Sequence, residues 1–136
     1  MASVITQTLH KRIIGNDKYR VIKFACTAHT DGSFDAVTTT TLNNKFMGWG
    51  LYKFQVEVGG TPPTASSDFT LTDSNGIDLL GGSGTDKITT SDTEGYPVIG
   101  TQPVVQPVVT PLTLTITNNS ENGATFNIYL YFKNTV

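Results

Sequence analysis

The amino-acid sequence predicts an all-β fold, a single β-sandwich or jelly-roll-like domain with extended arms. Three observations predict it. Apolar and polar residues alternate in several short runs, and no stretch of ten residues shows the spacing of an amphipathic helix. Clusters of Asn, Asp, Gly and Ser separate these runs at regular intervals. The composition is low in charge, at 15%, and holds 13 Gly and 6 Pro among 136 residues, as in a one-domain protein with many turns.

The start of the chain is expected to form an N-terminal arm or hairpin, residues 1–18, ahead of a β-sandwich domain at 19–136. Val4 to Leu9 alternates loosely and is either a strand or an extended arm. Gly-Asn-Asp at 15–17 is a turn signal, which makes Arg12 to Arg20 a hairpin. Tyr19 to Thr27 is then a strand whose buried face carries Ile22, Phe24 and Cys26.

Two further strands are predicted between residues 34 and 58. Phe34 to Leu42 follows an Asp-Gly-Ser turn and contains four consecutive threonines, whose β-branched side chains favour a pleated backbone. Phe46 to Val58 is longer, and the glycine-flanked Trp49 within it is assigned to the core rather than to a ligand platform. Its inward face is expected to carry Tyr52, Phe54, Val56 and Val58.

The middle of the chain reads as a hairpin and a loop. Asp68 to Thr72 is a strand, Asp-Ser-Asn-Gly at 73–76 is a turn, and Ile77 to Leu80 is the returning strand. In the polar loop from Gly81 to Gly95, residues 81–89 fit the calcium-binding repeat Gly-Gly-x-Gly-x-Asp-x-apolar-x once. Because calcium in such repeats is held between successive turns, a single copy lacks half of its ligands, and a flexible loop is expected.

The last third contains a proline-rich extended segment at 97–111 and two strands. Four prolines interrupt the segment from Tyr96 to Pro111, so it is an extended arm or an edge strand. Tyr129 and Tyr131 lie opposite the inward face of the final strand, where a subunit contact is favoured over a sugar-binding platform shared with Tyr52 or Trp49. The inward faces of the two strands carry Leu112, Leu114 and Ile116, then Phe126, Ile128, Leu130 and Phe132.

Little in the sequence suggests catalysis. The two histidines, His10 and His29, lack the spacing of zinc ligands, and no Ser-His-Asp arrangement, phosphate loop or dinucleotide motif is present. We therefore predict a protein that is not an enzyme and that uses no metal or cofactor. Cys26 is the single cysteine and is expected to be a buried, inert thiol.

Charge and hydropathy limit the partners. A net charge of -2 argues against nucleic acid, and no apolar run reaches the length of a membrane span. The start lacks the pattern of a signal peptide, so synthesis in a reducing cytoplasm is expected. Basic residues dominate the first part of the chain and acidic residues the later part, either as scattered solvated charges or as complementary docking ends.

Several stretches, taken in order, form a connected pattern of strands and turns: Phe24 to Ser33, Gly59 to Thr64, Asp68 to Asp73, Asn75 to Gly82, Tyr96 to Gly100 and Leu112 to Ser120. This pattern resembles a family of small all-β proteins encoded in the structural-gene regions of tailed bacteriophages. The likeness covers residues 19–132 and includes no catalytic signature. Residues 1–18 and the doubled Pro-Val-Val of 103–109 depart from it.

The resemblance implies a virion component made in the bacterial host cytoplasm, above all a capsid decoration or cement protein that bridges capsomers. A head-to-tail adaptor or tail component is the alternative within the virion, and a carbohydrate-binding, host-attachment module is the alternative from another class. Expected partners are the major capsid protein or other virion proteins, together with copies of the chain, as a trimer. The expected interface residues are Val4, Ile5, Leu9, Lys11, Arg12, Val104, Val105, Val108, Val109, Tyr129 and Tyr131.

Overall fold

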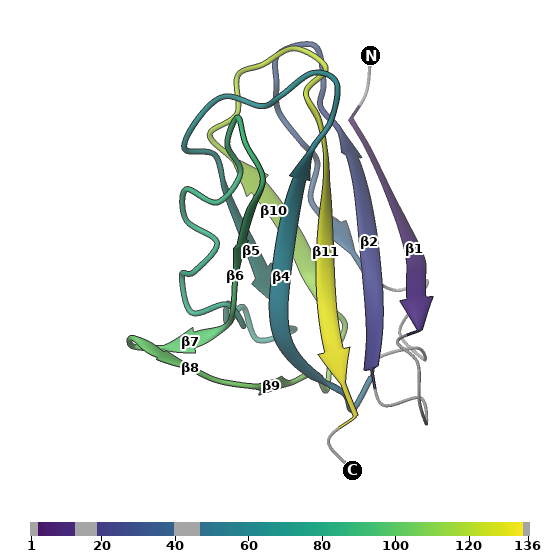
Figure 1. Cartoon of the computed structure of the whole chain (residues 1–136), viewed down its shortest axis with the longest axis vertical. Coiled ribbons are helices and arrows are strands. Elements are labelled where there is room, and N and C mark those ends of the chain that lie inside the picture. The colour runs from purple at the N-terminus through teal and green to yellow at the C-terminus, as the bar shows by residue number, and fades with distance from the viewer. Residues whose placement is uncertain (1–2, 13–18, 40–46, 135–136) are drawn as a thin grey trace.

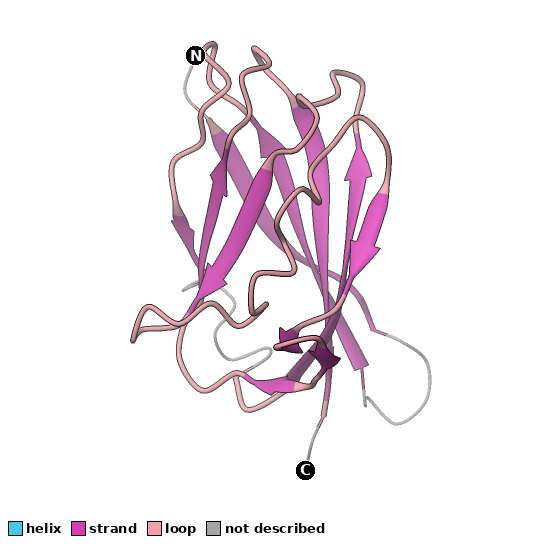
Figure 2. Ribbon diagram, turned by 90° about the vertical axis from the view of Figure 1, so that its left-hand side faces the viewer, coloured by secondary structure: helices cyan, strands magenta, loops and turns pink. Residues whose placement is uncertain are grey.

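The computed structural model describes residues 3–12, 19–39 and 47–134, and these form two antiparallel sheets that face each other (Figures 1 and 2). The all-β prediction is confirmed. The larger sheet contains, in spatial order, β1 (Val4–Arg12), β2 (Tyr19–Thr27), β11 (Thr125–Lys133), β4 (Gly50–Val58) and β6 (Thr93–Gly95), with β9 (Gln106–Pro107) paired to one end of β4. The smaller sheet contains β3 (Val37–Thr38), β10 (Thr113–Thr117) and β5 (Asp68–Thr72), and β7 (Val98–Ile99) pairs separately with β8 (Gln102–Pro103).

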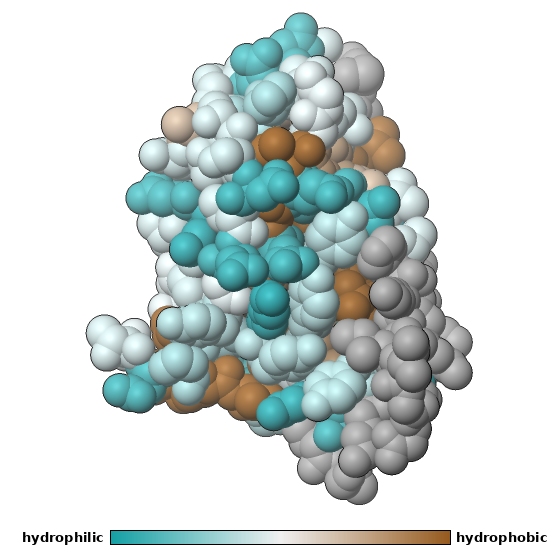
Figure 3. All heavy atoms as spheres, in the orientation of Figure 1, coloured by the Kyte–Doolittle hydropathy of each residue, from teal (hydrophilic) through white to brown (hydrophobic). Residues whose placement is uncertain are grey.

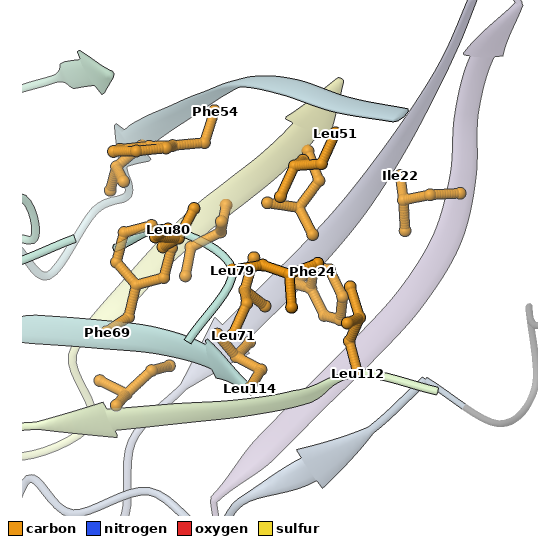
Figure 4. Packing of buried hydrophobic residues seen from close by; sticks show 14 of the residues in the cluster. Ile22, Phe24, Leu51, Phe54, Phe69, Leu71, Leu79, Leu80, Leu112 and Leu114 are labelled. Carbon is orange, nitrogen blue, oxygen red and sulfur yellow. The ribbon is translucent and has the colours of Figure 1, made fainter. Parts of the chain in front are cut away.

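The core is the apolar layer between these sheets, built from the alternating residues that the sequence places on inward faces. In Figure 4, side chains from both sheets meet in this layer. The rings of Phe54 and Phe69, one from each sheet, are 5.1 Å apart between centroids at 88°, an edge-to-face contact worth about 0.5–1.5 kcal/mol beyond the area that it buries. The inward residues predicted for β2, β10 and β11 are all buried: Ile22, Phe24, Cys26, Leu114, Ile116, Phe126, Ile128, Leu130 and Phe132.

The inward face of β4 differs from the prediction at one position. Tyr131 pairs with Lys53 and Phe132 with Leu51, so Tyr52 is an extra residue in a β-bulge. The bulge reverses the alternation. Leu51 is therefore fully buried, and Tyr52 joins Lys53 and Tyr131 on the side of the sheet away from the core.

The predicted return strand Ile77 to Leu80 is wrong. Only one isolated bridge, between Thr72 and Asp78, follows the Asp-Ser-Asn-Gly turn, and the chain then continues through further turns. The Asp78 carboxylate accepts hydrogen bonds from the backbone amides of Leu71 at 3.1 Å, Leu80 at 3.1 Å and Gly82 at 3.0 Å. Because these amides bond to a side chain, no strand partner is needed there.

The predicted strands Phe34 to Leu42 and Phe46 to Val58 are both shorter in the structure. The first is reduced to the two residues of β3, and residues 40–46 lie outside the described residues. Phe34 lies before β3, and its ring packs edge-on against that of Phe126, with the ring centroids 5.4 Å apart. The second begins at Gly50. Trp49 packs against the core, as expected, and the Arg20 guanidinium lies 4.4 Å from its ring centroid.

The proline-rich segment leaves the main sheet and then returns to it. The β7 and β8 hairpin projects to the side in Figure 1, and β9 pairs with Gly50 and Leu51 of β4. Val108 donates its amide to the Trp49 carbonyl at 2.9 Å and is fully buried. The end of the segment, from Gln106 to Val108, is therefore part of the sandwich.

We expect Asp78→Ala to lower the free energy of unfolding by about 1–3 kcal/mol, because three backbone amides lose a charged acceptor. Urea unfolding measures the change. Glu121→Ala is the control, since it removes one exposed carboxylate from a distant turn and should have little effect. Equal losses in the two variants would contradict the role of Asp78.

Burial raises the pKa of the Cys26 thiol far above its ordinary value of 9.0. Above that pH the unfolded chain releases a proton that the folded chain keeps, so the free energy of unfolding falls as pH rises, by up to about 1.4 kcal/mol per pH unit. Partial burial of Tyr52 and Tyr129, whose pKa is also raised, acts with the same sign above 10.0.

Between pH 9.0 and pH 10.0, the free energy of unfolding measured by chemical unfolding should therefore decline in the wild type and stay nearly level in Cys26→Ala. The slope is compared rather than the absolute stability, because removing the sulfur also alters core packing. Identical slopes would show that Cys26 is already accessible in the folded protein.

Candidate functional site

The side of the larger sheet that faces away from the core carries an unusual concentration of tyrosine and planar polar groups. We call this surface the outer face; it consists of Tyr52, Lys53, Gln55, Glu57, Asn127, Tyr129 and Tyr131 on β4 and β11. It faces the viewer in Figure 3, where hydrophilic side chains cross its centre. The strand alternation that buries Phe126, Ile128 and Leu130 places Tyr129 and Tyr131 here, and the bulge adds Tyr52.

A hydrogen-bond ladder joins β11 to β4 across the outer face. The Tyr129 hydroxyl donates to Glu57 Oε1 at 3.1 Å, and Asn127 Nδ2 donates to the same oxygen at 2.9 Å. One register step along, the Tyr131 hydroxyl is hydrogen-bonded to Gln55 Oε1. Each tyrosine thus reaches diagonally past its direct cross-strand partner, which holds its ring across the sheet.

The ladder extends to the edge strand β6 through Glu94. Gln55 Nε2 donates to Glu94 Oε2 at 3.4 Å, and Lys53 Nζ lies 3.6 Å from the same oxygen. β6 approaches β4 closely at Gly95, where a Cβ atom would lie only 2.5 Å from the Phe54 ring. A glycine is therefore needed for β6 to bring Glu94 to the outer face.

Aromatic rings and lysine ammonium groups pack together around Tyr52 and Tyr131 on the outer face. The Tyr52 ring lies 6.3 Å from that of Tyr131 and 6.0 Å from that of Tyr19, both edge-on. Lys53 and Lys133 place their ammonium groups 5.4 Å from the Tyr131 ring and 5.9 Å from the Tyr52 ring. Such cation–π contacts hold the lysines on the surface.

The electrostatics keep the tyrosine hydroxyls protonated as donors. Partial burial raises the pKa of Tyr129, and its hydrogen bond to Glu57 raises that pKa further. Partial burial also raises the pKa of Tyr131, with the nearby Glu94 charge acting in the same direction. At neutral pH the outer face therefore presents neutral phenols.

Two grooves border the outer face along β4 and β6. The first has a volume of about 570 Å³ and is lined in part by Gln55, Glu57, Asp92, Glu94 and Tyr129. The second has a volume of about 460 Å³, and Tyr52, Lys53, Lys87, Glu94 and Tyr96 contribute to its walls. Glu94 belongs to both, so the grooves adjoin.

The predicted interface residues of β1 lie along the edge of the larger sheet. In the described conformation β1 pairs with β2 over its whole length, with a bulge between Leu9 and Lys11. Val4 is 53% exposed, whereas Ile5 packs against the core. At Leu9, Lys11 and Arg12 the structure describes the backbone but not the side chains.

The four predicted valines of the proline-rich segment fall in different environments. Val109 is 73% exposed and Val105 39% exposed, while Val104 is half-buried. Val108 is fully buried against the core, so its assignment to an interface is wrong: β9 returns to β4 and turns this side chain inward.

Sequence reasoning missed Asp92, Glu94 and Tyr96 as surface groups of interest. All three were placed in or next to a polar loop, and the short β6 pairing that brings them to β4 has no periodic pattern of its own. The one available signal was Tyr96, an aromatic residue directly before a proline and 50% exposed in the structure.

One constellation resembles a catalytic triad in composition only. His29 Nε2 lies 3.2 Å from Asp35 Oδ2, and the Ser3 hydroxyl lies 3.3 Å from the same carboxylate oxygen. The Ser3 backbone amide donates to His29 Nε2 at 3.4 Å, and the Ser3 hydroxyl accepts a hydrogen bond from the Asp35 amide at 3.1 Å. The Ser3 hydroxyl and the imidazole thus share the Asp35 carboxylate, and these contacts hold the start of β1 beside residues 29–35.

Among residues 3–12, 19–39 and 47–134, no group of three His, Cys, Asp or Glu side chains is placed to hold a metal ion. The part of the chain that the structure describes also contains no helix of the length and hydropathy needed to cross a membrane. The single calcium-repeat match at 81–89 forms successive turns, and Asp86 donates its backbone amide to Asp68 Oδ1 at 2.7 Å.

In comparisons with known proteins, no family model, curated protein or solved structure matches this chain.

Proposed function

We propose that this chain is a structural protein of a tailed-bacteriophage virion, a non-enzymatic capsid decoration protein that bridges neighbouring capsomers. The proposal combines the resemblance of residues 19–132 with one observation from the fold. Of seven large hydrophobic side chains that are exposed in the described residues, four lie between positions 96 and 109: Tyr96, Ile99, Val105 and Val109.

This clustering supports a docking role for the proline-rich segment. The β7 and β8 hairpin carries Ile99 away from the sandwich, where its side chain is 65% exposed. Prolines at 97, 103 and 107 fix the backbone before any partner binds, which reduces the conformational entropy lost on docking. An exposed apolar, proline-stiffened hairpin suits a protein that adheres to a large surface.

The edge strand β1 offers a second contact. It pairs on one side with β2 and ends the larger sheet, so its other backbone edge faces away from the sheet. A neighbouring chain can add a strand there, with main-chain hydrogen bonds supplying affinity. A decoration protein needs two such contacts to bridge partners, here the major capsid protein and further copies of the chain, which we propose to assemble as a trimer.

A sedimentation experiment tests the proposal. Recombinant protein is mixed with purified heads of the encoding phage that were assembled without it, and bound protein is measured after sedimentation. We expect saturation at a fixed number of copies per capsomer. Ile99→Asp combined with Val109→Asp should weaken binding at least about tenfold, because both apolar contacts acquire charge.

Ile77→Asp is the matched control. The Ile77 side chain is 62% exposed, a fraction close to the 65% of Ile99, but it lies on a different turn, so the substitution should leave binding unchanged. Failure of the wild type to sediment with heads would contradict the proposal. Gold labelling of complete virions separates the remaining cases, since label confined to the tail or neck would identify an adaptor or tail component instead.

A further inference from the structure

The two adjoining grooves beside the outer face share only Tyr96 with the exposed apolar residues of the docking surface proposed above. They follow the junction of β4 and β6, whereas the exposed apolar residues lie on the proline-rich segment. The only residues of 96–109 that line either groove are Tyr96 and Val98. A ligand in the grooves would therefore leave Ile99, Val105 and Val109 uncovered.

The first groove offers planar hydrogen-bonding groups in fixed positions. Both hydrogen bonds to Glu57 end on Oε1, so Oε2 keeps its lone pairs for another donor. Gln55 is held between Tyr131 and Glu94, which fixes the plane of its amide. Side chains held in this way are preorganised for a ligand that presents several hydroxyl groups.

Aromatic rings line both grooves. Tyr129 lines the first part, and Tyr52 and Tyr96 line the second. Tyr52 and Tyr129 are fixed by ring and hydrogen-bond contacts, and Tyr96 is 50% exposed. Tyrosine combines an apolar ring face, which covers C–H surfaces, with a polar tip.

Other ligand classes fit these walls poorly. Glu57, Asp92 and Glu94 would repel the phosphates of a nucleic acid. An apolar peptide would have to desolvate these carboxylates, together with Lys53 and Lys87. In the described part of the chain these acids do not form a metal-binding group.

We propose that the adjoining grooves bind a neutral oligosaccharide that lies along the junction of β4 and β6. Hydroxyl groups of the sugar donate to Glu57 and Glu94 and bond to the Gln55 amide, while its ring C–H faces cover Tyr129 and Tyr96. Two lysines partly offset the three carboxylates, which suits an uncharged chain. On a virion, this site would hold the particle to polysaccharide at a cell surface.

The test is calorimetric titration of the full chain with maltohexaose, cellohexaose and chitohexaose, combined with amide chemical-shift mapping. We expect at least one of these probes to bind, with shifts centred on residues 52–57 and 92–96. Gln55→Ala and Tyr96→Ala should each weaken that binding at least about tenfold without changing the thermal midpoint. Ile77→Ala is the control, because Ile77 is a 62% exposed side chain that lines neither groove.

Absence of binding to all three probes would overturn the proposal, as would shifts centred on residues 98–109. Concentration-dependent self-association that is lost in Tyr96→Ala would also overturn it, because the grooves would then be covered by a second copy. Gln55→Ala should still sediment with phage heads like the wild type. The oligosaccharide site and the decoration function therefore succeed or fail independently.

Discussion

The antiparallel ladder of β2, β11 and β4 is the constraint on which the rest of the molecule depends. Three nine-residue strands pair over nearly their full length, so their side-chain alternation divides every residue between the core and the outer face. Burying Phe126, Ile128 and Leu130 obliges Asn127, Tyr129 and Tyr131 to face outward. The composition of the outer face is therefore a direct consequence of core formation, and a one-residue slip would exchange the two faces completely.

The outer face has the character of a structured polar surface rather than a second apolar face. Its tyrosines bond to Glu57 and Gln55, and its lysines lie against the aromatic rings. This arrangement reduces the support for an apolar subunit contact at Tyr129 and Tyr131, since the hydroxyls already have polar partners and a covering subunit would have to accommodate them. Most of the exposed large hydrophobic side chains in the described residues lie instead on or next to the proline-rich segment.

Much of the fold could be predicted from the sequence because strict alternation is a strong local signal. It identified the inward faces of β2, β10 and β11 and the buried thiol of Cys26. It failed where one residue acts non-locally: the bulge at Tyr52 depends on pairing with β11, and Asp78 replaces a strand by bonding three amides along the chain. Only part of the candidate site could be predicted, because Glu94 and Tyr96 reach the outer face through a three-residue strand that has no periodic pattern of its own. The burial of Val108 could not be predicted either, because it follows from a two-residue pairing between β9 and β4.

The position of β11 in the middle of the larger sheet also determines when that sheet can form during synthesis. Its neighbours, β2 and β4, are not consecutive with it in sequence and do not pair with each other, so neither can form its ladder with β11 until residues 125–133 have been synthesised. Until then both strands present an open edge and an unburied apolar face. The nascent chain therefore keeps open strand edges, which are prone to aggregation, until the central strand is available.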